Sequence, residues 1–401
     1  MAQPLVYGID VGTTKIVAIA GRVNARRDAV EVVSIGEAPS RGLKRGVVVD
    51  REAAADSVAE AVEACGLRGQ RVSVGIAGSH ISSFNTEVTL LNRGRNLTIT
   101  ERFARKLEQE AREVEDLQED ERVIHVVPRG YVLDGAEGVK RPVGLAARKV
   151  TMRAHVVSGA VSSIQNLLRA VEDAGVTVGR VVLEPLASAE ACLTASDRDN
   201  GVVLLDVGGG TTDIATFLKG ALTHTAVIPI GGESFTSDLS YGLKIPHADA
   251  EALKIKYGTV LSGAVDSVAA VPFGGTHYNA SFMSQILEYR AREILDYTRE
   301  SLNEARVRDQ APGGAVLTGG GSLLDGMPEL AETVLGMRAR TAAPTRIKGN
   351  NKPVLKPQYA TAVGLLYFGA KNGHSGPKGK GGGASSINGI VSAVRSWFRG
   401  G

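Results

Sequence analysis

Aspartate, glycine and threonine occur together at two places in this chain, in patterns that suit phosphate chemistry. The clearer one is the segment VVLLDVGGGTTDIA, in which the apolar run Val202–Leu205 leads directly to Asp206. The glycines Gly208–Gly210 lack a Cβ, so the backbone there can adopt positive φ angles and approach a ligand closely. Backbone N–H groups in such a turn, with the hydroxyl of Thr211, are phosphate donors. We therefore predict a buried strand that runs into a phosphate-binding turn.

A similar pattern lies near the start of the chain. The segment LVYGIDVGTTKIVAIAG sets Asp10, Gly12, Thr13 and Thr14 between two apolar runs, as a hairpin would. Two hairpins of this kind predict two related half-domains that face one nucleotide. Lys15 follows directly, and the residues leave two interpretations open: a lysine that reaches a phosphate, or a solvated lysine on the hairpin.

A third strand and glycine turn occurs near the end of the chain. The short apolar run at 315–318 opens into Gly319, Gly320, Gly321 and Ser322, and a helix is expected after it. A glycine turn of this kind permits close approach of the backbone to a flat base or its ribose. It is a candidate for the nucleoside end of the same site.

Two smaller features add candidates. Gly231 and Gly232 form a tight turn before a helix, and Glu251 and Lys254 lie one turn apart on the next helix. The Glu251–Lys254 pair is either an ion pair on the surface or a clamp on ribose or adenine.

The periodicity of the chain predicts the elements that must position these residues. Apolar residues recur at helical spacing in seven segments, which lie between the predicted strands: 51–65, 162–174, 186–195, 235–242, 247–257, 282–306 and 359–368. The segment 79–158 looks like an inserted unit with its own α+β pattern, with strands at 85–91, 123–127 and 149–157. Its helix is expected to begin at a capping box made by Thr98 and Glu101.

Composition limits the function. The chain has 401 residues, a hydrophobic fraction of 43% and a charged fraction of 22%, which are ordinary for a globular protein. We expect no membrane-spanning helix, because no run of 18 apolar residues exists. We expect no export signal, because the N-terminal segment MAQPLVYGID enters a strand without a basic region followed by an apolar one. Cys65 and Cys192 are expected to be small core residues in a reducing cytosol. The net charge of +3 is too small to suggest nucleic acid.

The last 31 residues differ from the rest. Residues 371–401 contain five Lys or Arg and no acid, so the positive excess lies in this tail. Residues 371–385 are rich in glycine and are expected to form a flexible linker. Residues 386–401 predict an amphipathic helix too short to span a bilayer, which would lie in the membrane interface. Its apolar and basic membrane residues are Ile387, Ile390, Val391, Val394, Arg395, Trp397, Phe398 and Arg399. The alternative is a helix that docks on its own protein or on a partner.

The order of these motifs resembles that of the actin and sugar-kinase ATPase superfamily, which includes the heat-shock chaperone ATPases. Within it, the match is closest to the FtsA family of bacterial cell-division actin homologues. The resemblance covers nearly the whole chain and rests on these segments: GIDVGTTK, VGIAGSHI, HVVPRGY, DVGGGTTDIA, IPIGGESFTSDLSYGL, AEALKIKYG, VLTGGGSLL and the C-terminal helix.

The resemblance implies a nucleotide site that binds ATP and Mg²⁺. The turns Gly12–Thr14 and Gly208–Thr211 would cradle the β- and γ-phosphates with their backbone N–H groups. Asp10, Asp206 and Asp213 would hold Mg²⁺ largely through its waters.

The resemblance extends to the nucleoside and to the attacking water. Glu251 and Lys254 would contact ribose and adenine, with Gly320–Leu323 behind the nucleoside. Glu184, in a Glu-Pro pair, occupies the place where the chaperone relatives position a water. Only weak ATP hydrolysis, if any, is expected here, because a filament switch does not require efficient turnover.

The implied fold class is α/β: an actin-like ATPase fold with two ribonuclease-H-like half-domains around a nucleotide cleft, an inserted α+β subdomain and a C-terminal amphipathic helix. We expect a first half at 1–78 and 159–198, interrupted by the insertion at 79–158. The second half would comprise 199–230, 231–306 and 307–370.

The implied function is an ATP-bound, filament-forming adaptor on the cytoplasmic face of the cell membrane at the septum. It would hold the FtsZ polymer by binding the FtsZ C-terminal tail through residues 231–306, attach to anionic lipid, and help to recruit later division proteins of the membrane. The alternatives are a PilM-like adaptor of pilus assembly and a small-molecule kinase of the same superfamily.

Overall fold

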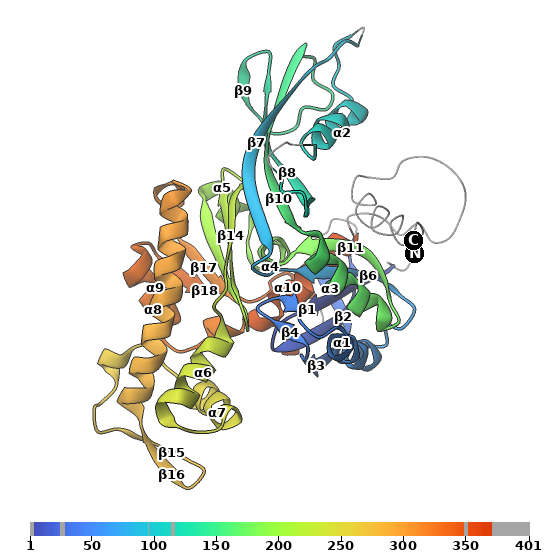
Figure 1. Cartoon of the computed structure of the whole chain (residues 1–401). Helices are drawn as coiled ribbons and strands as arrows, with labels where there is room; N and C mark the ends of the chain where they lie inside the picture. The colour runs from blue at the N-terminus through green and yellow to red at the C-terminus, as the bar shows by residue number, and fades with distance from the viewer. Residues whose placement is uncertain (1–3, 25–28, 95, 114–116, 349–351, 371–401) are drawn as a thin grey trace.

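A computed structural model describes residues 4–24, 29–94, 96–113, 117–348 and 352–370. Two mixed sheets form the centres of two half-domains, and a smaller third sheet projects from between them (Figure 1). The predicted membrane helix and its linker, at 371–401, lie outside the described residues. In the part of the chain that is described, no helix is long and apolar enough to cross a membrane.

The two large sheets have the same arrangement of neighbouring strands. In the first, the order is β11-β6-β1-β2-β3-β19, and in the second it is β14-β13-β12-β17-β18. Each contains three antiparallel strands, β1-β2-β3 or β12-β13-β14, and each continues with parallel strands from β1 or β12. This likeness confirms the prediction of two related halves.

The strands of the first sheet are β1 (Leu5–Val11), β2 (Lys15–Val23), β3 (Val30–Pro39), β6 (Arg71–Ile76), β11 (Thr177–Leu183) and β19 (Ile347–Lys348). Those of the second are β12 (Val202–Val207), β13 (Thr212–Leu218), β14 (Ala221–Ile228), β17 (Ala315–Thr318) and β18 (Ala339–Thr341). All six residues of β12 are buried, as its continuous apolar run predicted. Short two-stranded pairs are formed by β4 (Leu43–Lys44) with β5 (Val47–Val48), and by β15 (Ala270–Phe273) with β16 (Thr276–Asn279).

Helices cover both sheets. Those of the first half are α1 (Arg51–Cys65), α3 (Val161–Asp173), α4 (Glu184–Cys192) and α10 (Ala360–Ala370). Those of the second half are α5 (Ala195–Asn200), α6 (Gly232–Leu243), α7 (His247–Tyr257), α8 (Ala280–Glu304) and α9 (Met327–Leu335). Single 3₁₀ turns are η1 (Ser262–Ala264), η2 (Arg308–Gln310), η3 (Gly320–Leu323), η4 (Lys352–Val354) and η5 (Pro357–Tyr359).

Local signals explain where several helices begin and end. Asp50 caps α1 by accepting the N–H of Ala53, and Gly66 closes it in the left-handed conformation with φ 75°. The observed bounds of α1 and α7 are those predicted from periodicity. In α4, by contrast, the helix begins two residues earlier than predicted, so Glu184 lies at its first position.

One boundary differs from the expectation. The sequence predicts that residues 307–370 belong to the second half, but β19 pairs with β3 of the first sheet, and α10 packs on β1, β2 and α4. A Cβ at Gly364 would overlap the carbonyl oxygen of Ala187, so the glycine allows α10 and α4 to lie in close contact. The chain therefore returns to the first half after β18, because the apolar α10 completes that core.

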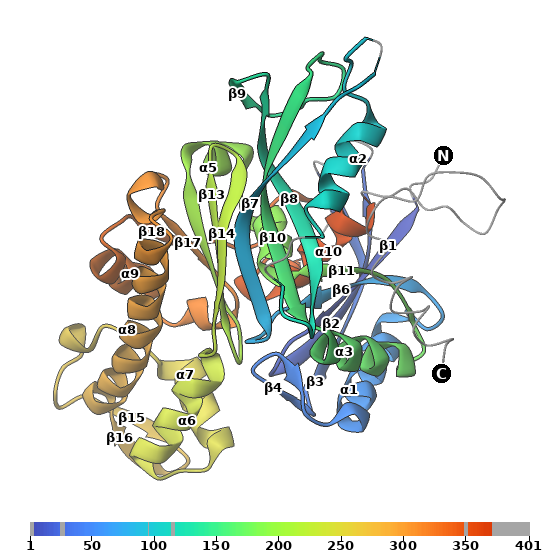
Figure 2. The same ribbon diagram turned by 45° about the horizontal axis from the view of Figure 1, so that its top comes forward.

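The inserted unit is a four-stranded sheet in the order β7-β10-β8-β9 with one helix. Its elements are β7 (Ile81–Leu91), α2 (Glu101–Glu110), β8 (Glu121–Leu133), β9 (Ala136–Val139) and β10 (Lys149–Ala160). The predicted capping box is wrong: Thr100, not Thr98, caps α2 by accepting the N–H of Phe103, because Thr98 forms a β-bridge with Ala146. Figure 2 shows β7 and β10 beside β14 of the second half.

Candidate functional site

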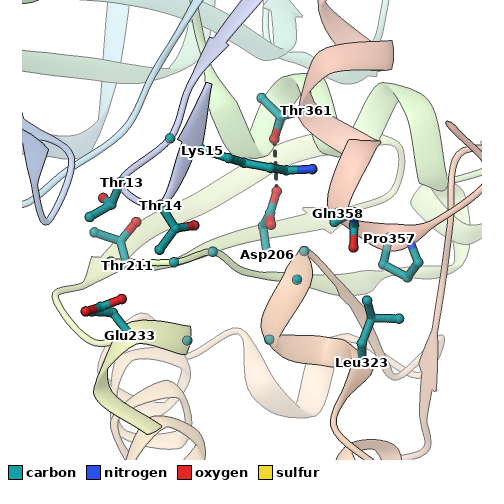
Figure 3. Close-up of a pocket in the computed structure, with 18 of the residues that line it drawn as sticks. Thr13, Thr14, Lys15, Asp206, Thr211, Glu233, Leu323, Pro357, Gln358 and Thr361 are labelled. Atoms are coloured by element: carbon teal, nitrogen blue, oxygen red, sulfur yellow. Dashed lines mark hydrogen bonds between the residues drawn. The ribbon is translucent and has the colours of Figure 1, made fainter. Parts of the chain in front are cut away.

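A cavity of about 510 Å³ lies between the half-domains, where the β1–β2 and β12–β13 hairpins meet. Figure 3 shows Thr13 and Thr14 of one hairpin beside Thr211 of the other. Eighteen of the predicted site residues line the cavity: Asp10, Gly12, Thr13, Thr14, Lys15, Glu184, Asp206, Gly208, Gly209, Gly210, Thr211, Asp213, Gly232, Glu251, Lys254, Gly319, Gly320 and Gly321. Of the residues predicted for the nucleotide site, the exceptions are Gly231 and Ser322.

The turns of the two hairpins are packed against each other. A Cβ built at Gly209 would lie 2.5 Å from Cγ2 of Thr14, and one at Gly210 would overlap the hydroxyl of Thr13. The threonine hydroxyl of Thr13 also accepts a hydrogen bond from Gly46 N at 3.1 Å. The threonine side chains of the first hairpin therefore leave no room for side chains at these glycines of the second, whether or not a ligand is bound.

The turn before α6 supports the second hairpin from behind. Gly232 N donates to the carbonyl oxygen of Gly208 at 2.8 Å, and Glu233 N donates to that of Gly209 at 2.8 Å. Gly231 does not line the cavity, because it lies against this loop: a Cβ there would be 2.6 Å from Gly208 O. The start of α6 thus fixes the conformation of the glycine turn.

Four carboxylates lie together in the cavity: Asp206 and Asp213 are buried, and Asp10 and Glu184 are half-buried. Burial and the negative charge of Asp206 raise the pKa of Asp10 from 3.8 to about 7. Burial and Asp206 likewise raise the pKa of Asp213 to about 8. Burial, with the charges of Asp10 and Asp213, raises the pKa of Glu184 well above its ordinary value. The cluster therefore disfavours its own full ionisation.

Asp206 is held more firmly than its neighbours. Its Oδ2 accepts hydrogen bonds from the hydroxyl of Ser188 and, at 3.2 Å, from that of Thr361. Burial raises the pKa of Asp206, and these two hydroxyls oppose the rise. Ser188 on α4 and Thr361 on α10 were not found from the sequence, because neither stands in a recognisable motif. Figure 3 shows Thr361 aimed at Asp206.

The donor set fits a hydrated Mg²⁺. Among the residues that the structure describes, no three His, Cys, Asp or Glu side chains are spaced to bind a metal ion directly. Even so, Asp213 Oδ1 is buried without a hydrogen-bond partner, and a cation would offset the mutual repulsion of the carboxylates. Mg²⁺ usually keeps several waters and takes further ligands from phosphates. Carboxylates that are not spaced to bind the ion directly can therefore hold it through those waters.

Lys15 is not a solvated lysine on the hairpin. Its Nζ is buried without a hydrogen-bond partner, lies 3.6 Å from Glu37 Oε2, and is 4.0 Å from the centre of the Tyr359 ring. Burial lowers its pKa, while the charges of Glu37 and Asp10 oppose that change. A buried ammonium that lines the cavity can contribute positive charge to a phosphate.

The Glu251–Lys254 pair serves the structure of the cavity wall. Lys254 Nζ lies 2.6 Å from Glu251 Oε2 and donates to Gly232 O at 3.0 Å and to Thr236 Oγ1 at 2.8 Å. Thr236 in turn donates to Glu251. The pair is thus partly buried and ties α7 to the start of α6, while both side chains also face the cavity.

The third glycine turn lies against the second hairpin. Gly319 has φ 82°, and a Cβ there would overlap Asp206 Oδ1, so only glycine fits. Ser322 is buried and donates to Gly319 O at 2.8 Å, which explains why it stabilises the turn instead of lining the cavity. The exposed apolar side chains at this end are Ile255, 74% exposed, and Leu323, 52% exposed.

Several lining residues were not predicted as site residues: Glu37, Gly46, Ala77, Glu233, Phe235, Ile255, Gly258, Leu324, Pro357, Gln358, Ala360 and Thr361. Glu233 follows the predicted Gly231–Gly232 turn and could have been included with it. Pro357 and Gln358 come from the segment before α10, where no sequence pattern indicated a site.

Two family models match the chain. The model described as "Cell division protein FtsA" matches residues 203–364, and the one described as "SHS2 domain inserted in FTSA" matches residues 78–158. The second match contains β7, α2, β8 and β9 and most of β10, so the separate small sheet is an inserted SHS2 domain.

Solved structures with this fold are actin-like. The PilM–PilN type IV pilus biogenesis complex contains a chain with a TM-score of 0.68 at 16% identity, covering 91% of this chain and 98% of that one. MreB5 of Spiroplasma citri bound to ADP has a TM-score of 0.55 at 13% identity, covering 91% and 95%. The predicted actin-like ATPase fold is confirmed.

Cell division proteins of other bacteria are similar in sequence to this chain over nearly its whole length. The cell division protein FtsA of Pseudomonas aeruginosa is 38% identical over 382 residues, which cover 93% of this chain and 91% of that protein. The FtsA of Escherichia coli K12 is 32% identical over 414 residues, covering 99% and 96%. This chain therefore belongs to the FtsA family of cell division proteins.

Proposed function

We propose that the protein binds Mg²⁺ and ATP between its two hairpins and, in that state, forms filaments that attach the FtsZ polymer to the membrane. The observation that carries the proposal is that both glycine–threonine turns and four carboxylates, two of them buried, line one cavity. N–H groups of Gly12–Thr14 and Gly208–Thr211, with Lys15, would hold the β- and γ-phosphates.

The carboxylates would hold the metal, whose positive charge on the phosphates is the chemistry that it supplies. Asp10, Asp206 and Asp213 would do this largely through water, and Asp206 is already oriented by two hydroxyls. Glu184 would position the attacking water. Burial and the charges of its neighbours raise the pKa of Glu184, which disfavours the ionised form that accepts a proton from water, so hydrolysis would be slow.

Ribose and base would lie at the opposite end of the cavity. Glu251 and Lys254 are held in place there by Thr236, so they offer fixed polar contacts for a ribose. The exposed side chains of Ile255 and Leu323 provide apolar surface for the faces of a base.

The FtsZ tail would bind to residues 231–306. In this segment Tyr241 is 89% exposed and Tyr289 is 74% exposed, and Phe282 is also exposed. A Cβ at Gly242 would lie 2.6 Å from Ile286 Cδ1, so the end of α6 lies on the α8 turn that carries Phe282. Large exposed aromatic side chains on adjacent helices favour a peptide site.

Membrane attachment would come from residues 386–401, with Trp397 and Phe398 on the apolar face. One such helix binds reversibly. A filament presents many copies together, so its high effective helix concentration makes attachment firm. ATP binding would therefore control membrane attachment by controlling assembly. Later division proteins would join this assembly at the septum.

Co-sedimentation with anionic liposomes tests the proposal. The full chain is mixed with ATP, Mg²⁺ and FtsZ, with and without the FtsZ C-terminal tail. We expect FtsZ to pellet only when it has its tail, and Trp397→Glu to leave the protein in the supernatant while nucleotide binding is unchanged. Pelleting of tailless FtsZ, or of the Trp397→Glu variant at the normal level, would contradict the adaptor role.

The alternatives predict other results. A small-molecule kinase would release ADP only when an acceptor is added, and a PilM-like adaptor would not retain FtsZ. Identity of 38% to an FtsA over most of both chains favours the division adaptor.

A further inference from the structure

The SHS2 domain contacts both halves of the molecule. Its chain enters from β6 and leaves into α3, both in the first half, yet its strands β7 and β10 lie against β14 of the second half (Figure 2). Ser83 Oγ donates to Thr225 O at 2.9 Å, and Asn85 Nδ2 donates to Thr223 O at 3.1 Å. The inserted domain therefore spans the two half-domains that close the cavity.

His155 completes this contact in one tautomer. A carbonyl oxygen only accepts, so Asn85 must present its Nδ2 to Thr223 and its Oδ1 to His155 Nδ1, 2.9 Å away. His155 Nδ1 therefore carries the proton, and Nε2 accepts the hydroxyl of Thr225 at 2.9 Å. The ring is 1% exposed, and burial lowers its pKa to about 3, so it stays neutral.

Strand β14 connects this contact with the glycine turn. Five residues beyond Thr225, the carbonyl oxygen of Ile230 accepts the hydroxyl of Thr212 at 2.8 Å. Gly232 then donates to Gly208 in the turn itself. A shift of β14 against the inserted domain therefore moves one wall of the cavity.

The inserted domain also contacts the opposite wall. His125 of β8 is buried, and its Nε2 accepts the backbone N–H of Leu183 at 3.1 Å. Leu183 is the last residue before α4, whose first residue is Glu184. The inserted domain thus bonds to the backbone N–H of Leu183, next to Glu184 in the first half. It also bonds to β14 in the second half.

We infer that the SHS2 domain is a clamp on the nucleotide cleft, in which His155, Asn85 and Thr225 are positioning residues that favour the closed arrangement. Opening the cleft moves β14 away from the first half, to which the inserted domain is joined, so these hydrogen bonds must break or the domain must tilt. By linkage, a nucleotide that closes the cleft also orders the inserted domain. Contacts that order the inserted domain in turn strengthen nucleotide binding. The inference rests on the proposed nucleotide site.

Thr225→Val tests it in the full chain, with Thr223→Val as the matched control. Both threonines lie on β14 and are 7% exposed, but the hydroxyl of Thr223 bonds only to Ala221 O in its own strand. We expect Thr225→Val to raise the Kd for Mg²⁺ and ATP about fivefold, the value of one lost hydrogen bond, and Thr223→Val to leave it unchanged.

Hydrogen exchange supplies a readout that a purely structural role would not move. ATP should slow exchange in β7 and β14 in the unaltered protein and in Thr223→Val, and should have little effect in Thr225→Val. Asn85→Ala, at an exposed position, should repeat the effect of Thr225→Val if that variant folds poorly. Equal Kd values and equal protection in all variants would overturn the clamp while the nucleotide site stands. Absence of ATP binding in the unaltered protein would overturn both.

Discussion

The two hairpins that meet at the cavity look alike in sequence. The residues that occupy equivalent positions in the structure, however, are not those that the sequence similarity aligns. By sequence, the Thr-Thr pairs of DVGTTK and DVGGGTTD correspond. By register, the last pairs are Val11 with Ile16 and Val207 with Thr212, so each turn contains four residues. Thr13 and Thr14 therefore stand where the second hairpin has Gly209 and Gly210.

This difference makes the hairpins complementary in shape. Where one turn has threonine side chains, the other has bare glycine backbone, and the two pack together. Two identical turns would either collide or leave a gap. The glycines of the second turn thus permit the cleft to close.

The hairpins also differ in charge. Lys15 occupies the position of Thr211, and Val17 occupies that of Asp213. The first hairpin thus carries a cation suited to phosphate, and the second carries an additional carboxylate, Asp213 of β13, suited to a metal. In the proposed site, both hairpins would contact phosphate and metal, but only the first adds a lysine and only the second adds a further carboxylate.

Adding a side chain at Gly209 should break the complementarity most severely. Gly209→Val places methyl groups in the space of Thr14, and we expect the Kd for Mg²⁺ and ATP to rise about 100-fold, as measured by titration with a fluorescent analogue. Gly209→Val combined with Thr14→Gly should recover the affinity of Thr14→Gly alone. Gly263→Val is the control, since no atom lies within 4 Å of its Cβ. No recovery in the double variant would show that the glycine serves the ligand alone.

Removing one carboxylate from each hairpin tests how their charges differ. Asp10→Asn and Asp206→Asn should each weaken binding of Mg²⁺ and ATP about tenfold, and should abolish ATP-dependent assembly on anionic liposomes. Without nucleotide, Asp10→Asn should raise the unfolding temperature more than Asp206→Asn, because two hydroxyls already compensate the Asp206 charge. Calorimetry above about pH 8 measures this difference. Normal assembly by Asp206→Asn would refute its assignment as a metal ligand.

The carboxylate cluster predicts the smallest effect, a dependence of stability on pH. The pKa values of Asp10 and Asp213 are about 7 and about 8 in the folded protein, against 3.8 when unfolded. Between pH 3.8 and these folded values, the folded state therefore binds more protons than the unfolded state. Stability without Mg²⁺ should therefore fall as the pH rises through this window, by a few degrees in unfolding temperature between about pH 5 and about pH 8.5.

Adding Mg²⁺ and ATP should remove most of that fall, since the cation favours the ionised carboxylates. Asp213→Asn should flatten the profile without ligand. A profile that is flat in the unaltered protein would show that the carboxylates do not repel one another.

Much of this molecule was determined by local sequence. The apolar run of β12, the caps Asp50 and Gly66 of α1, and the spacing in α7 are set by neighbours in the chain, so these elements were predicted well. The aspartates and glycines of both hairpins were found for the same reason, because a strand, a carboxylate and a tight turn are contiguous. The inserted unit could be recognised from its own strand and helix pattern.

The tertiary structure decided what depends on segments far apart in the chain. Ser188 and Thr361 reach Asp206 from two helices that close packing at Gly364 brings together, and no local pattern signals this. The return of α10 to the first half, the match of threonines to glycines across the cleft, and the Asn85–His155–Thr225 contact arise in the same way. Sequence periodicity reports which face of an element is buried, whereas only the folded chain fixes which face lies opposite it.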